Sequence, residues 1–242
     1  MTQGIDNIFI AIYMATWRKA QGKLKKCIIL APKSCKESVW ARQIEKFTGE
    51  KSLIVGGTPS KRDKIYKQYL KRDILFLIFS YETFRVDFEK LKEIGILNNG
   101  NEGVGMIILD EIQKVKNVRA QISKAVKNAQ VRFAVGLTGT PVYNRPEDIF
   151  GPMHIISPGL LGGNFWRFTD KYLVKGGYGG HEVTGYQNLE ELKSKVESVS
   201  IRRLKEHVLN LPEKVYEDLS CEMIDPKQKE AYESMREELF AW

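Results

Sequence analysis

Short, uninterrupted apolar runs alternate with amphipathic stretches along the first half of the chain. Apolar runs without polar alternation are typical of strands covered on both faces. With helices between them, they predict an α/β domain with a mostly parallel sheet flanked by helices. The runs are Cys27–Ala31, Ser52–Val55, Ile74–Phe79, Met106–Leu109 and Val131–Leu137.

The stretches between the runs predict helices. Lys61–Lys71 reads as a charged helix, and Ile8–Ala15 as a buried helix or strand. Ile8–Ala15 is too short for the roughly 20 residues that span a bilayer, and it lacks the basic leader of a signal peptide. A further helix is predicted over Lys36–Phe47, with one apolar side formed by Val39, Trp40, Ile44 and Phe47.

The alternation of apolar runs with amphipathic stretches ends near residue 150. This change predicts one domain over 1–150 and a mostly helical extension over 151–242. Gly176–Gly180 reads as a flexible loop or hairpin turn. Asn188 followed by Glu191 predicts a capping box at a helix start. Asp225-Pro226 predicts the start of a last helix, which runs up to Trp242 without a stop signal, and we therefore expect the chain to be truncated.

Composition narrows the class of protein. Of the 242 residues, 43% are hydrophobic and 28% are charged, which excludes a chain that is mainly disordered. Three cysteines with no C-x-x-C pair argue against a disulfide framework or a cysteine zinc site. Residues 1–80 carry 16 Lys and Arg against 6 Asp and Glu, a net +10, while the whole chain is +8. That asymmetry fits either a surface facing a polyanion or a solvated lysine-rich face.

Two motifs at strand ends carry the candidate chemistry. Asp110 and Glu111 directly follow the run Met106–Leu109 and would project from the carboxyl edge of the sheet, where parallel sheets bind ligands. In a nucleotide hydrolase the first carboxylate of such a pair holds Mg²⁺ and the second orients and deprotonates water. Gly136–Pro141 follows the next run and predicts a tight polar turn. Each motif alone also fits an ordinary turn, but the order and spacing of the two motifs argue against a chance match.

These motifs resemble the first motor lobe of the Swi/Snf-type helicase-related ATPases of helicase superfamily two. Asp110–Asn117 is similar to the family's extended acidic box, and Leu137–Asn144 to its third motif. Two further segments resemble contacts with nucleic-acid backbone: Ala31–Ser34 followed by Trp40, and Phe79–Glu82. Three more segments resemble the run that closes this lobe in the family: Asn188–Glu191, Ile201–Lys205 and Leu211–Lys214.

The resemblance implies a RecA-like, three-layer lobe that uses ATP and Mg²⁺ and moves on double-stranded DNA without sequence preference. Asp110 would hold Mg²⁺ through water and Glu111 would be the catalytic base. Gln113, Thr138, Gly139 and Thr140 would couple hydrolysis to movement. DNA backbone would meet Pro32, Lys33, Ser34, Ser80 and Tyr81.

Two departures from the family pattern matter. Gln113 stands where histidine is common, and glutamine can still donate and accept hydrogen bonds. The phosphate-loop pattern G-x-x-x-x-G-K-[ST] does not occur in the chain. Gln3 would mark the edge of that loop, so we expect Met1 to fall just downstream of it. No second motor lobe is recognised either, and the chain alone is therefore expected to be inactive.

Two alternatives remain at the level of sequence. One is a non-catalytic nucleic-acid-binding module, and the other is the motor subunit of a restriction-type superfamily-two helicase. The leading reading, an ATP-dependent motor on DNA, predicts an intracellular protein with no membrane partner and no small-molecule substrate other than nucleotide. Its compartment would be the cytoplasm or nucleoid in a prokaryote or virus, and the nucleus in a eukaryote.

Overall fold

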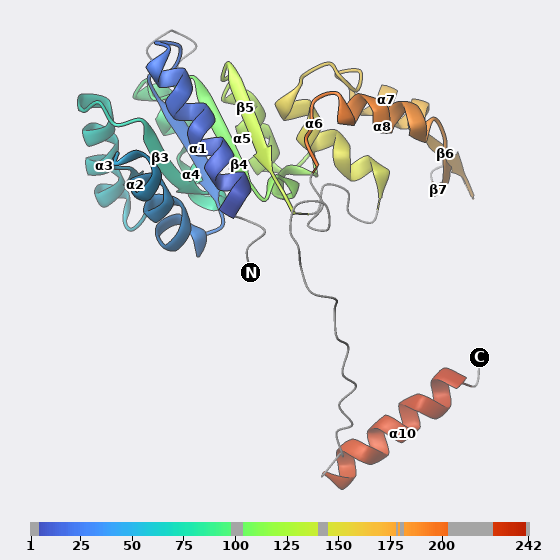
Figure 1. Cartoon of the computed structure of the whole chain (residues 1–242). Coiled ribbons are helices and arrows are strands. Elements are labelled where there is room, and N and C mark those ends of the chain that lie inside the picture. Colours follow the sequence, from blue (N-terminus) through green and yellow to red (C-terminus); the bar gives the residue numbers. More distant parts are fainter. Residues whose placement is uncertain are drawn as a thin grey trace, which may run out of the picture. The chain divides into compact units, whose positions relative to one another are not determined.

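Five parallel strands form the central sheet of the computed structural model (Figure 1), in the order β2-β3-β1-β4-β5. The structure describes residues 5–97, 104–139, 145–177, 179, 182–202 and 225–240. The strands are β1 (Cys27–Ala31), β2 (Leu53–Ile54), β3 (Phe76–Ser80), β4 (Met106–Asp110) and β5 (Phe133–Leu137). Each expected apolar run overlaps one of them, and β3 and β4 each extend one residue past their run, to Ser80 and Asp110. This confirms the α/β class with a mostly parallel sheet.

Helices cover both faces of this sheet, as its uninterrupted apolar strands require. On one face α1 (Ile5–Ala20), the π-helical η1 (Lys36–Ala41) and α2 (Arg42–Thr48) pack over side chains such as Ile29 and Ile108. The other face is covered by α3 (Pro59–Lys71), α4 (Tyr81–Glu93), the short 3-10 helix η2 (Ile112–Val115) and α5 (Gln121–Asn128). Successive strand residues belong to opposite clusters because the side-chain period of a strand is two.

Two expected helical faces differ from the structure. The predicted helix Lys36–Phe47 starts as a π-helix and continues as α2, and Phe47 is 40% exposed although its neighbours Trp40 and Ile44 are fully buried. In the Ile8–Ala15 run, α1 buries only the side that faces the sheet, with Ile8, Ala11, Ile12 and Ala15. An amphipathic helix on a sheet has one covered side, so a continuous apolar run need not be buried all round.

Beyond β5 the chain adds helices and one hairpin. These elements are η3 (Pro146–Ile149), α6 (Phe150–Ile156), α7 (Phe165–Tyr172), the antiparallel strands β6 (Leu173–Gly176) and β7 (Glu182–Tyr186), and α8 (Leu189–Glu197). The expected capping box before α8 is wrong. Asn188 has a left-handed backbone, and its amide donates to the Lys171 carbonyl instead of capping the helix.

Residues 1–200 form one compact unit and residues 201–242 another. In the second unit α10 (Pro226–Phe240) begins at the proline that the sequence marks as a helix start. The expected domain boundary near residue 150 stays a prediction. Among the described residues, none of the helices has the length and apolar character needed to cross a membrane.

Candidate nucleotide and nucleic-acid site

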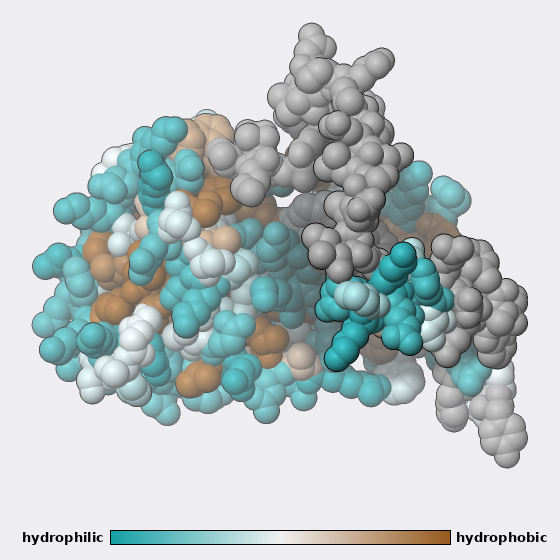
Figure 2. Space-filling model, turned by 90° about the horizontal axis from the view of Figure 1, so that it is seen from below, coloured by the Kyte–Doolittle hydropathy of each residue, from teal (hydrophilic) through white to brown (hydrophobic). Residues whose placement is uncertain are grey.

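Parallel pairing brings the ends of four strands to one edge of the sheet. Ala31 is paired with Ser80, and Asp110 with Leu137. The segment Pro32–Ser34, the Ser80–Tyr81 pair, the Asp110–Glu111 pair and Thr138 therefore all lie at the carboxyl edge. Figure 2 looks toward this edge, where hydrophilic residues surround scattered hydrophobic ones.

Asp110 is the last residue of β4, and its carboxylate is partly buried. The Trp40 indole N–H donates to Asp110 Oδ2 at 2.8 Å. Burial raises the pKa of the Asp110 carboxyl above its ordinary value, and the nearby Glu111 charge adds to this, while hydrogen bonds from Trp40 and the Glu111 backbone N–H oppose it. Burial is the largest of these causes, so the ionised form of Asp110 is disfavoured in the folded chain.

Glu111 follows in the left-handed backbone region, with φ 53° and ψ 58°. This turn ends β4 and starts η2. The amide of Gln113 donates a hydrogen bond to Glu111 Oε2. Gln113 thus holds the Glu111 side chain directly, whereas its own buried Oε1 has no hydrogen-bond partner among the described residues.

The other expected site residues are placed as follows. Lys33 and Ser34 are exposed, and Pro32 is half-buried. Ser80 is buried, and its hydroxyl accepts from the Thr83 backbone N–H at 3.2 Å and so caps α4. Thr138 is half-buried and Gly139 is exposed, directly after β5. Gln3 and Thr140 lie outside the described residues.

Two aromatic residues contact Asp110, which the sequence did not predict: Tyr81 was expected only as a DNA-backbone contact, and Trp40 only as part of the first backbone-contact segment. Trp40 bonds to the carboxylate, and the Tyr81 hydroxyl donates to the Asp110 backbone carbonyl at 2.7 Å. A buried Trp or Tyr usually needs a partner for its polar atom, which is the only signal that the sequence offers. It does not say which acceptor is used.

The residues at Asp110 fit a hydrated Mg²⁺ ion. Two hydrogen bonds to the Asp110 carboxylate, from Trp40 and from the Glu111 backbone, leave lone pairs free for bound water. Mg²⁺ is commonly bound through one or two carboxylates together with substrate phosphates and its own waters. Within the described ranges no cluster of three or more His, Cys, Asp or Glu could hold a metal by itself, so phosphate would have to supply further ligands.

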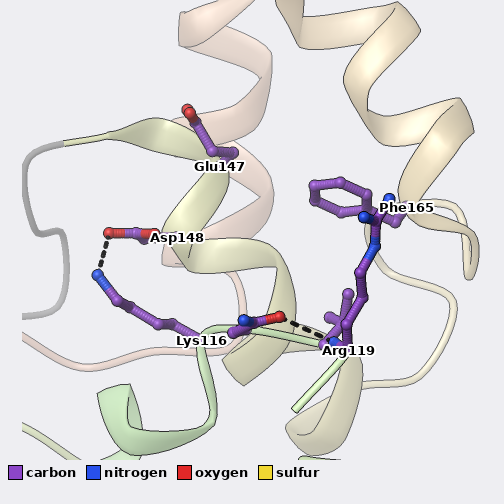
Figure 3. Close-up of a pocket in the computed structure, with 7 residues that line it drawn as sticks. Lys116, Arg119, Glu147, Asp148 and Phe165 are labelled. Carbon is purple, nitrogen blue, oxygen red and sulfur yellow. Dashed lines mark hydrogen bonds and ion pairs between the residues drawn. The ribbon is translucent and has the colours of Figure 1, made fainter.

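A pocket of about 290 Å³ is lined by residues that follow the acidic pair in the sequence (Figure 3). It lies between the segment 116–119, η3 and the start of α7. Lys116 forms an ion pair with Asp148 across it at 2.9 Å. Asn117 accepts a hydrogen bond from the Arg119 backbone N–H. The ion pair attaches the end of the acidic segment to η3, which follows the third motif, while the Asn117 hydrogen bond stays within the segment.

Comparison with known proteins agrees with this architecture. The SNF2-related domain model matches residues 1–241. A double-stranded DNA complex of the Sulfolobus solfataricus SWI2/SNF2 ATPase core superposes with a TM-score of 0.66 at 24% identity, over 99% of this chain and 47% of that one. A structure of the Sulfolobus solfataricus SWI2/SNF2 ATPase core domain gives a TM-score of 0.61 at 26% identity, over 96% of this chain and 44% of that one.

Sequence relatives point the same way. An uncharacterised ATP-dependent helicase of Mycoplasma pneumoniae is 30% identical over 82% of this chain, and a chicken RAD54-like DNA repair and recombination protein is 28% identical over 88%. The fold and the strand-end motifs define a RecA-like lobe of helicase superfamily two. Within that class, the chain belongs to the SNF2-related domain family. It spans 17% of the Mycoplasma protein and 30% of the RAD54-like protein.

Proposed function

We propose that this chain is the first lobe of an ATP-dependent motor that moves on double-stranded DNA. The observation that carries the proposal is the shared carboxyl edge, where the acidic pair lies beside both segments expected to contact DNA backbone. The relatives support it, because they include proteins named as ATP-dependent helicases and a solved core bound to double-stranded DNA. A motor of this kind would act in the nucleoid or the nucleus.

Each residue of the edge would have a separate task. Mg²⁺, when bound, neutralises charge on the nucleotide phosphates. Asp110 would hold the ion's hydration water, and Trp40 fixes the direction in which the carboxylate points. Glu111, oriented by Gln113, would accept the proton of the attacking water. Thr138 and Gly139, directly after β5, would relay the state of the acidic pair.

DNA would be bound through the charge of its backbone, without recognition of its base sequence. Lys33 and Ser34 are exposed just after β1, and backbone contacts of this kind carry no sequence information. Non-specific affinities typically lie at about 10⁻⁴–10⁻⁶ M and fall steeply with salt.

The test is a titration of labelled duplexes of unrelated sequence with the chain, at several salt concentrations. All duplexes should bind alike. The Lys33→Ala variant should bind more weakly and reduce the salt slope by about one. The control is Lys25→Ala, because Lys25 is also exposed but precedes β1 and so lies at the opposite edge. A flat salt dependence, no binding at low salt, or equal losses in the two variants would refute the DNA assignment.

A further inference from the structure

Trp40 connects the first expected DNA segment with the acidic pair. Its side chain is fully buried in η1, six positions after Ser34, and its N–H donates to the Asp110 carboxylate. A hydrogen bond to an ionised acceptor is stronger than one between neutral groups. A π-helical turn in place of a regular one is frequently found at functional sites.

The turn that carries Trp40 is tied firmly to Pro32–Ser34. The Ser38 hydroxyl donates to the Ser34 carbonyl at 2.7 Å, and the Cys35 N–H donates to the Pro32 carbonyl at 2.9 Å. At the start of η1, the buried Lys36 ammonium donates to the Val55 carbonyl at 2.7 Å. Ser34 is therefore joined to η1 by a direct hydrogen bond from Ser38, while Lys36 holds the start of η1 against the chain after β2.

Tyr81 makes the corresponding connection from the second segment. It directly follows Ser80 and donates to the Asp110 backbone carbonyl. Tyr81 belongs to the core cluster on one face of the sheet and Trp40 to the cluster on the other face. Asp110 is thus held from both faces, by Tyr81, which is itself an expected DNA contact, and by Trp40, whose turn is bonded to Pro32–Ser34.

We propose that Trp40 and Tyr81 are positioning residues through which DNA backbone bound at Pro32–Ser34 and Ser80 reorients the Asp110 carboxylate. The inference rests on the proposed function, because it needs DNA at this edge. It adds a physical route by which DNA alters the nucleotide site. By linkage, a ligand on Asp110 would alter DNA affinity by the same factor.

The route can be followed by NMR on the chain itself. It contains four tryptophans, Trp17, Trp40, Trp166 and Trp242, and so gives four indole N–H signals after ¹⁵N labelling. Loss of one signal in Trp40→Phe assigns that resonance. Because Trp40 is fully buried, duplex DNA cannot touch it. We expect its signal nevertheless to shift on addition of duplex, with the same midpoint as the binding curve.

A matched pair of variants tests the second connection. Tyr81→Phe removes the hydroxyl bonded to Asp110, and the DNA-induced shift of the Trp40 signal should become smaller. Tyr69→Phe removes a hydroxyl that is equally buried but bonds to the Leu75 carbonyl near the opposite edge, so the shift should persist. Equal effects of the two variants would overturn the role of Tyr81.

The outcomes separate the two proposals. An unmoved Trp40 signal at saturating DNA overturns the coupling and leaves DNA binding standing. Absence of DNA binding overturns the proposed function and the coupling with it. If Trp40→Phe fails to fold, replacing Trp17, Trp166 and Trp242 one at a time assigns the Trp40 signal by elimination, and the wild-type titration still decides the role of Trp40.

Discussion

Asp110 has a carboxylate whose charge is unfavourable in the folded chain. Its pKa is raised, chiefly by burial, so the folded state binds a proton more tightly than the unfolded state does. At pH values above the raised pKa the carboxyl is ionised in both states, and the folded state bears the whole cost of the buried charge. As pH falls through the raised pKa toward the ordinary value of 3.8, that cost disappears.

Asp110→Asn should therefore stabilise the chain in the absence of metal and nucleotide. We expect the free energy of unfolding at neutral pH to rise by about 0.5–2 kcal/mol, the usual size of a single stabilising substitution. The difference in free energy of unfolding between Asp110→Asn and wild type should become smaller as the pH falls. Urea unfolding measured from about pH 7.5 to about pH 4.5 checks both the sign and the trend.

Glu89→Gln is the control for this prediction. Glu89 is 75% exposed, and replacing it should change stability by less than about 0.5 kcal/mol. An Asp110→Asn variant less stable than wild type at neutral pH would mean that the hydrogen bonds from Trp40 and the Glu111 backbone outweigh the effect of burial.

Residue patterns predict the acidic pair but not its surroundings. Asp110 and Glu111 are adjacent and end an apolar run, so their place at a sheet edge follows from local sequence. Trp40 and Tyr81 are 70 and 29 positions from Asp110. Their contacts depend on strand order, which puts β1 between β3 and β4, and no local pattern specifies that order.

At the scale of elements, the strands were predictable because a strand covered on both faces must be apolar throughout. The π-helical start at Lys36 was not, since the same side chains would suit a regular helix and tertiary bonds such as Lys36 to Val55 decide between them. Asn188 is a similar case. Its side chain bonds across to Lys171 in α7, and this contact replaces the local cap.

Helix α6 packs unusually close to the segment that follows Glu111. A Cβ atom built on Gly151 would lie 2.4 Å from the Val115 carbonyl oxygen and 2.5 Å from that of Lys116. Both atoms belong to the backbone and cannot swing aside. Glycine at this position is therefore required by packing, although alanine is the better helix former by about 1 kcal/mol.

We expect Gly151→Ala to lower the free energy of unfolding by about 1–3 kcal/mol, the usual cost of overpacking. Chemical denaturation followed by circular dichroism measures it. Gly185→Ala is the matched control, because its added methyl would meet Val174 at an ordinary 3.7 Å. If both variants lose the same stability, the close approach of α6 is not the cause.

At the scale of the whole molecule, the proposed motor would need a phosphate loop and a second motor lobe in addition to this edge. A polypeptide that joins this chain to an upstream phosphate loop and a second motor lobe should be a DNA-stimulated ATPase. In it, Glu111→Gln should keep nucleotide affinity and lose about 10²–10⁴-fold in turnover, since only the proton acceptor is removed. Asp110→Asn should weaken nucleotide binding as well, because it removes a metal contact.

The measurement pairs nucleotide titration with turnover at saturating DNA for both variants. The diagnostic result is that Glu111→Gln loses turnover but keeps its nucleotide affinity, whereas Asp110→Asn loses affinity as well. Equal losses of affinity in the two variants, or near-normal turnover of Glu111→Gln, would contradict the roles of Asp110 as a metal contact and Glu111 as the proton acceptor.

The left-handed backbone of Glu111 has an evolutionary consequence. A non-glycine residue held there costs about 1–2 kcal/mol, and glycine would relieve the cost. Selection for stability and selection for hydrolysis therefore oppose each other at this position, as they do at Asp110. A descendant that had given up hydrolysis would gain stability from glycine or asparagine here while its fold persisted, so position 111 would record the loss of the motor.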